Sequence, residues 1–109
     1  MLLFKKKFLD AIRTGRKTQT VRVWKRRYVR AGQLSYTPGV GKIRIVSIDE
    51  VALDELDEQD ALRDGFDDVE QLVAEIQNLY AERLENGYRV FRIRFEKADD
   101  VAVQRPTES

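Results

Sequence analysis

The chain has 109 residues, of which 42% are hydrophobic and 36% are charged, and it contains neither cysteine nor histidine. This length suits one domain with a single core. Without cysteine there is no disulfide or thiolate chemistry, and without histidine the commonest general base and metal ligand is missing, so we expect no metal and no other cofactor. No apolar run approaches membrane-spanning length, so we expect a cytoplasmic protein without membrane contact, with a monomer as the default.

The net charge of +1 hides a strong asymmetry along the chain. Residues 1–46 carry 13 Lys or Arg against one acid, net +12, and residues 47–86 carry 14 Asp or Glu against two Arg, net −12. Residues 87–109 carry five basic residues against four acids, net +1. A basic face of this kind is a candidate surface for a phosphate-bearing partner. The alternative is that the two segments neutralise each other across packed elements.

The first part of the chain predicts a helix followed by a strand. Apolar residues recur at helical spacing from Phe4 to Ile12, and Gly15 follows as a C-terminal cap, so we expect an amphipathic helix over residues 4–13. From Thr18 to Trp24 the apolar period changes to two, which predicts a half-buried strand.

Two further strands are expected before the middle of the chain. A basic connector leads into a short strand near residues 34–36. The run over residues 42–53 is rich in β-branched residues, and its apolar phase slips between Ile45 and Val46. Such a slip indicates a bulge or bend, as a curved sheet needs.

Two helices are expected next. Asp57, with Asp60 three residues later, can cap a short helix that stops at Gly65. Asp67 and Glu70 form a capping-box-like pair ahead of a strong helical pattern over residues 68–84.

The stretch "YRVFRIRFE" predicts the last strand. Its inward residues are Phe91, Ile93 and Phe95, and its outward residues are Val90, Arg92 and Arg94. Periodicity ends after this strand, so we expect one domain over residues 1–97 and a flexible tail over residues 98–109. The order of helix, strands, two helices and strand defines an α+β fold.

The stretch "GRKTQTVR" places Lys17 three residues before Thr20, and this pair is a candidate for catalysis. A threonine hydroxyl becomes a nucleophile when a base accepts its proton, and a lysine does so when burial or nearby charge, such as Arg16 and Arg22, lowers its pKa. Residues three apart face opposite sides of a strand, so the two side chains meet only if a corner at Gly15 folds the lysine back. The alternative is a solvated lysine and an ordinary strand-forming threonine.

Asp64 is the third candidate. It lies in the last turn of its helix, where the macrodipole disfavours an anion, so we expect a basic partner. The alternative is an exposed aspartate tolerated beside Arg63.

Aromatic and basic positions are candidate contacts to nucleic acid. Trp24 shares a strand face with Thr20 and Arg22, and Tyr36 lies on the following strand, where rings beside guanidinium groups suit base stacking. Core packing is the alternative for the tryptophan. The basic connector either contacts phosphates or is only a solvated loop. The candidate binding residues are Arg16, Arg22, Trp24, Lys25, Arg26, Arg27, Arg30 and Tyr36.

These segments together resemble the ASCH domain of the PUA-like superfamily, over almost the whole chain to about Lys97. The most specific element is the pattern Gly-x-Lys-x-x-Thr-x-Arg, formed by Gly15, Lys17, Thr20 and Arg22. The "ALRDGF" ending of the short helix supports it. The resemblance implies a small bent β-barrel with an N-terminal helix, two helices inserted before the last strand, and a site for RNA or nucleosides.

One branch of that family removes the acetyl group from N4-acetylcytidine with a Lys, a Thr and a Glu. The resemblance places these roles on Lys17, Thr20 and Asp64, so an aspartate, one methylene shorter, stands where the family has glutamate. We expect a protein that binds RNA or a modified nucleoside. An amidohydrolase with Thr20 as nucleophile is one alternative, and a metal-independent ribonuclease is another.

Overall fold

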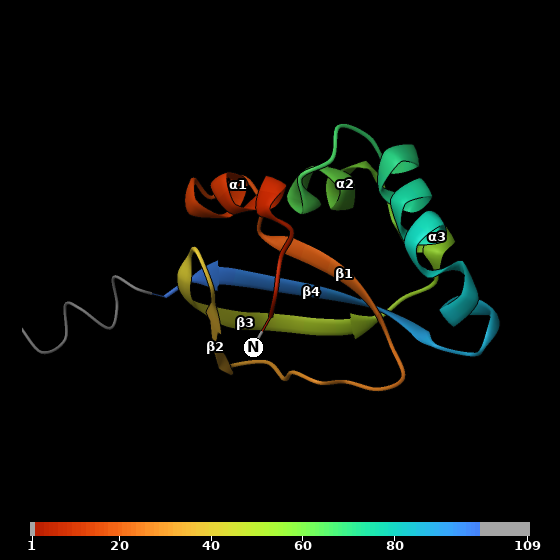
Figure 1. The fold of residues 1–109 in the computed structure, drawn as a ribbon, viewed down its shortest axis with the longest axis horizontal. Coiled ribbons are helices and arrows are strands. Elements are labelled where there is room, and N and C mark those ends of the chain that lie inside the picture. The colour runs from red at the N-terminus through yellow and green to blue at the C-terminus, as the bar shows by residue number, and fades with distance from the viewer. Residues whose placement is uncertain (1, 99–109) are drawn as a thin grey trace, which may run out of the picture.

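The fold is built on one antiparallel sheet with three helices beside it. The computed structural model describes residues 2–98 (Figure 1). The strands are β1 (Gln19–Trp24), β2 (Leu34–Thr37), β3 (Gly41–Glu50) and β4 (Arg89–Lys97). The helices are α1 (Leu9–Arg13), α2 (Glu58–Asp64) and α3 (Val69–Glu85), with the 3-10 turns η1 (Lys6–Phe8) and η2 (Leu53–Glu55). The predicted α+β class is confirmed.

The sheet has the strand order β1-β4-β3-β2. Among the described residues β1 and β2 form its two opposite edges, so the sheet stays open instead of closing into the expected barrel. Trp24 and Tyr36 therefore lie on opposite edge strands, although these strands are consecutive in the sequence. The reason is that the connector over residues 25–33 carries the chain across the sheet from one edge to the other (Figure 1).

Strand β3 bends where the sequence predicts. Its pairing with β4 shifts register between Ile45 and Ser47, which confirms the bulge. Ile45 is fully buried whereas Val46 is half exposed, as the slip in apolar phase requires. A bulge increases the local twist of a strand, so the long β3 curls with the sheet.

The N-terminal helix begins later than predicted. The expected helix over residues 4–13 starts as a 3-10 turn at Lys6, and the segment before it runs across the sheet. The Leu2 N–H donates to Ser35 Oγ at 3.2 Å, and the Leu2 carbonyl accepts from Thr37 Oγ1 at 3.1 Å. Because Leu2 is also buried in the core, tertiary packing overrides the helical period at this end.

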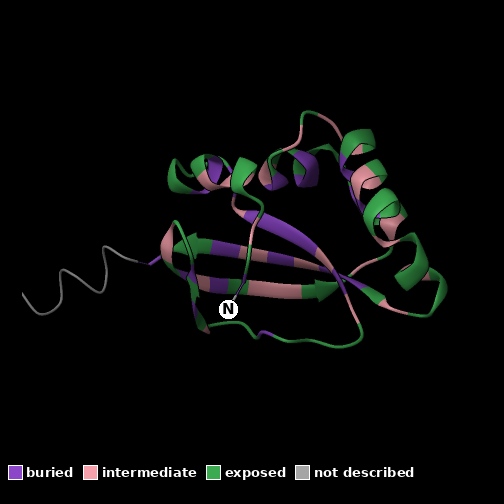
Figure 2. Cartoon of the chain, viewed as in Figure 1, coloured by how far each residue is buried: buried purple, intermediate pink, exposed green. Residues whose placement is uncertain are grey.

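Two hydrophobic clusters pack against the sheet, one on each face. Figure 2 shows the buried positions along its strands. One cluster contains Phe91, Ile93 and Phe95, the three residues predicted to point inward. The second cluster packs against α2 and α3 and includes Val21 and Val90. The outward position expected for Val90 is therefore wrong, because α2 and α3 cover the face that the sequence pattern assigns to solvent.

Side chains cap α2 and α3. In α2, Asp57 and Asp60 accept each other's backbone N–H at 3.0 and 3.1 Å, and Gly65 ends the helix with φ +94°, which confirms both predictions. In α3 the cap is Asp68, which has extended φ and ψ and accepts from the backbone at 2.9 Å. The predicted Asp67–Glu70 pair is therefore wrong by one residue.

The described part of the chain contains no helix that is long and apolar enough to span a membrane. Ala98, the first residue of the predicted tail, is buried, and its N–H donates to the Lys42 carbonyl at 3.0 Å. The rest of that tail lies outside the described residues.

Candidate functional site

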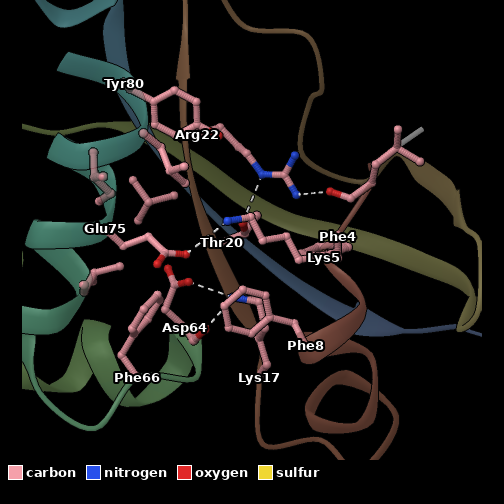
Figure 3. A pocket seen from close by; sticks show the side chains of 15 residues that line it. Phe4, Lys5, Phe8, Lys17, Thr20, Arg22, Asp64, Phe66, Glu75 and Tyr80 are labelled. Atoms are coloured by element: carbon pink, nitrogen blue, oxygen red, sulfur yellow. Dashed lines mark hydrogen bonds and ion pairs between the residues drawn. The ribbon is translucent and has the colours of Figure 1, made fainter.

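A pocket opens between the N-terminal segment, β1, the end of α2, and α3 (Figure 3). Its volume is about 110 Å³, of the order of the cavity of about 150 Å³ that holds one benzene ring in another protein. Phe4, Phe8 and Phe66 supply aromatic wall. The polar side chains that line it are Lys17, Thr20, Arg22, Asp64, Glu75 and Tyr80, with Lys5 at its N-terminal side. The three predicted catalytic residues therefore share one pocket.

Lys17 reaches the pocket because the corner before β1 turns its side chain inward. Gly15 has φ +83°, a conformation that other residues rarely adopt. The Lys17 N–H then donates to the Ala11 carbonyl at 3.0 Å, so the corner stays bonded to α1. Arg16 is exposed, whereas the Lys17 side chain is only 2% exposed. The corner predicted at Gly15 is present, and it buries the lysine.

Lys17 is paired with Asp64. The Lys17 Nζ lies 2.7 Å from Asp64 Oδ1 and also donates to the Asp64 backbone carbonyl. It lies 4.5 Å from the centroid of the Phe8 ring, which adds a cation–π contact. Asp64 is thus a buried anion at a helix C-terminus with the basic partner that its position requires.

Burial dominates the acid–base properties of this pair. Burial lowers the pKa of the Lys17 ammonium, and the carboxylate of Asp64 only partly offsets this. Burial likewise raises the pKa of the Asp64 carboxyl, against the opposing charge of Lys17. The other carboxylate oxygen, Oδ2, is buried and has no hydrogen-bond partner among the described residues. The pocket therefore holds one unused acceptor beside a lysine that loses its proton more readily than usual.

Thr20 lies on β1 and contacts Arg22 rather than Lys17. Its Oγ1 accepts a hydrogen bond from Arg22 Nε at 3.0 Å, and Arg22 also donates to the Leu3 carbonyl at 2.7 Å. Within residues 2–98, the side-chain hydrogen bonds of Lys17 both go to Asp64. The Thr20 hydroxyl acts only as an acceptor among the described residues. Its hydrogen can therefore be donated to a ligand.

Sequence reasoning missed three polar residues of the pocket, Lys5, Glu75 and Tyr80, and the three phenylalanines of its wall. Glu75 interrupts the apolar face of α3, between Leu72 and Leu79 at helical spacing, and a carboxylate on a buried face is a signal that the sequence does contain. Tyr80 has non-helical dihedral angles inside α3, φ −128° and ψ 20°. That kink cannot be read from the periodicity.

The remaining predicted binding residues lie outside this pocket. Arg16 lines a neighbouring surface hollow that shares Phe8, Phe66 and Glu75 with the pocket. Trp24 packs partly buried against the core, edge-on to the Tyr28 ring at 5.1 Å. Tyr36 is exposed on β2. The basic residues of the connector, all exposed, are Lys25, Arg26, Arg27 and Arg30.

The described residues contain no group of three or more His, Cys, Asp or Glu side chains placed to hold a metal ion. The polar groups that line the pocket are two lysines, one arginine, two carboxylates and two hydroxyl groups.

Comparison with known proteins identifies the fold. No protein-family model matches the sequence, and no curated protein is significantly similar to it. The crystal structure of hypothetical protein PH0355 is similar, with a TM-score of 0.71 and 22% identity over 86% of this chain and 94% of that one. An ASCH domain from Lactobacillus crispatus has a TM-score of 0.67 and 16% identity, over 81% and 68% of the two chains. The solution structure of PF0455 from Pyrococcus furiosus has a TM-score of 0.61 and 22% identity, over 86% and 92%.

These similarities define a structural class. The chain has the fold of an ASCH domain, as the sequence motifs predict.

Proposed function

We propose that this protein binds one nucleobase, of RNA or of a modified nucleoside, in the pocket around Lys17, Thr20 and Asp64. The observation that carries the proposal is a ring-sized pocket that combines aromatic walls with charged donors and acceptors. A flat heterocycle needs both, because its faces make π contacts and its edges make hydrogen bonds.

The hydrogen-bonding groups of the pocket suit the mixed edge of a base. Thr20 has a free hydroxyl hydrogen, and Asp64 Oδ2 is an unused acceptor. Arg22 is anchored by two hydrogen bonds through Nε and one terminal nitrogen, which leaves the other terminal nitrogen to donate. Since these groups are already held in place, a base that pairs with them orders few side chains on binding.

The connector supports binding of a polynucleotide. It follows directly on β1, the strand that carries Thr20 and Arg22. Its four basic side chains are exposed, and none of them has an ion pair with a described acid. Exposed Lys and Arg contact phosphates without reading sequence, so this segment adds affinity to the selectivity of the pocket.

Amide-resonance mapping by NMR tests this proposal on the intact chain. Titration with nucleosides should shift the resonances of pocket residues such as Thr20, Val21 and Ile76. A short single-stranded RNA should additionally shift residues of the connector, Arg26 and Arg27 among them. Unchanged spectra with both ligands, or shifts confined to residues away from the pocket, would contradict the proposal.

A second candidate function is hydrolysis of an acyl amide on a base, and the buried Lys17–Asp64 pair beside Thr20 favours it. In this reaction the Thr20 hydroxyl attacks the carbonyl carbon, the amine leaves, and water then releases the acid from the enzyme. Lys17, with its lowered pKa, or Asp64, with its raised pKa, is suited to transfer the proton. Arg22 donates to one lone pair of the threonine oxygen, and the second lone pair is the one that would attack.

Hydrolysis of N4-acetylcytidine by the wild type and by Thr20→Val separates the two functions. Valine keeps the branched shape and the strand preference but has no hydroxyl. An amidohydrolase that uses this threonine should lose turnover, whereas a binding protein should lose only about 1 kcal/mol of affinity. Turnover that survives in Thr20→Val would exclude the threonine as nucleophile.

A further inference from the structure

Glu75 is a carboxylate of the pocket wall that the proposed function leaves unused. It lies on α3 between Leu72 and Leu79, both of which also line the pocket. Its side chain is 27% exposed, and Figure 3 shows it extending from α3 into the pocket. Glu75 is therefore placed to touch a ligand.

The protein makes little use of this carboxylate. Among the described residues Glu75 has no side-chain hydrogen bond, and its Oε2 lies 3.7 Å from Lys5 Nζ and 3.6 Å from Lys7 Nζ. Both lysine side chains are more than half exposed. Long, solvated ion pairs of this kind contribute little stability, so the carboxylate keeps acceptor capacity for a ligand.

We propose that Glu75 is a specificity-determining residue that accepts a hydrogen bond from an exocyclic amino group of the bound base. An ionised carboxylate only accepts, so it attracts an amino N–H and repels the lone pairs of an oxo group at the same position. The free Oδ2 of Asp64 is a second acceptor in the same pocket and strengthens this bias. The pocket therefore selects amino-bearing bases over their oxo counterparts, an inference that rests on the proposed function.

Affinity measured for two matched pairs of nucleosides, cytidine with uridine and adenosine with inosine, tests the inference by calorimetry. Within each pair an amino group replaces an oxo group, and the adjacent ring nitrogen changes from an N–H donor to an acceptor. The wild type should bind the amino member of at least one pair about tenfold more tightly, as expected for one hydrogen bond to a charged acceptor. Glu75→Gln should reduce that preference to near unity, because an amide side chain both donates and accepts.

Two controls separate selection from a structural role. Glu82→Gln, on the exposed side of α3 and outside the pocket, should keep the preference. The variant Lys7→Ala removes an ion pair of Glu75 at a residue outside the pocket and should keep it as well. All variants should unfold at nearly the temperature of the wild type.

The outcomes distinguish this inference from the function on which it rests. Equal affinities within both pairs, or a preference that survives Glu75→Gln, would overturn the role of Glu75 and leave base binding intact. Loss of the preference in Lys7→Ala would overturn it too, because the ion pair would then set the specificity. Failure of all four nucleosides to bind, together with unchanged NMR spectra on addition of RNA, would overturn both proposals.

Discussion

Replacing Lys17 by methionine measures how strongly the buried ion pair holds the pocket together. Methionine keeps the length and apolar stem of the side chain but removes the ammonium. The two side chains are only 2% and 5% exposed, and the Nζ–Oδ1 distance is 2.7 Å. Solvent therefore screens neither their attraction nor the charge that remains when one of them is removed. Removing one partner of such a pair leaves an uncompensated charge, and we expect a loss of about 3 kcal/mol in the free energy of unfolding. For a domain of this size that corresponds to a fall of roughly 12–24 °C in Tm.

The pH dependence of this loss follows from the pKa of Asp64. Lys17 lowers that pKa by its charge and its hydrogen bond, while burial raises it, so Lys17→Met leaves burial dominant and the pKa higher still. A group whose folded pKa lies above its unfolded value, near 3.8, destabilises the fold when ionised at higher pH. The penalty is therefore full above the folded pKa and disappears as the pH falls toward 3.8. Wild type and variant should differ more at about pH 7 than at about pH 4.5.

Urea unfolding followed by the fluorescence of the single tryptophan provides the assay. The exposed Lys5→Met variant is the matched control and should change stability little. The double variant Lys17→Met/Asp64→Leu should recover most of the loss, because it buries no charge. A loss of less than about 1 kcal/mol in Lys17→Met, or an equal loss at both pH values, would refute the reasoning.

Three further predictions concern the corner of α2, the connector and metals. Gly65→Ala and Gly87→Ala should each lower the free energy of unfolding by about 1–2 kcal/mol, because alanine is strained in a left-handed backbone. The two losses should match, since the added methyl at Gly65 has only ordinary contacts of 3.5–3.7 Å and that at Gly87 has none within 4 Å. A much larger loss at Gly65 in thermal unfolding would contradict this. Replacing Lys25 and Arg27 by Ala should flatten the log–log salt dependence of single-stranded RNA binding by about 0.7 per lost contact, and an unchanged slope would make the connector a solvated loop. A chelator should leave ligand binding and any hydrolysis unchanged, since residues 2–98 bring together no metal-ligating cluster; activity lost to a chelator and restored by a divalent ion would disprove it.

The sequence by itself determined the local features of this protein. Periodicity and capping residues located the sheet strands and α2, and the slip at Ile45 located the bulge, because each of these signals depends on neighbours a few residues apart. The glycine corner ahead of β1 also followed from local chemistry. The composition indicated in advance that any catalysis would have to use Lys, Asp, Glu, Tyr, Ser or Thr.

Only the tertiary structure decided which of these groups meet. Lys17 and Asp64 are 47 residues apart, and their pairing depends on how α2 packs beside β1. The same packing buries Val90 and brings Glu75 to the pocket, whereas the crossing of the connector separates Trp24 from Tyr36. Local patterns describe which side of an element is apolar, but they carry no information on what will cover that side. Which element covers an apolar side depends on the burial of apolar surface between residues that are far apart in the sequence.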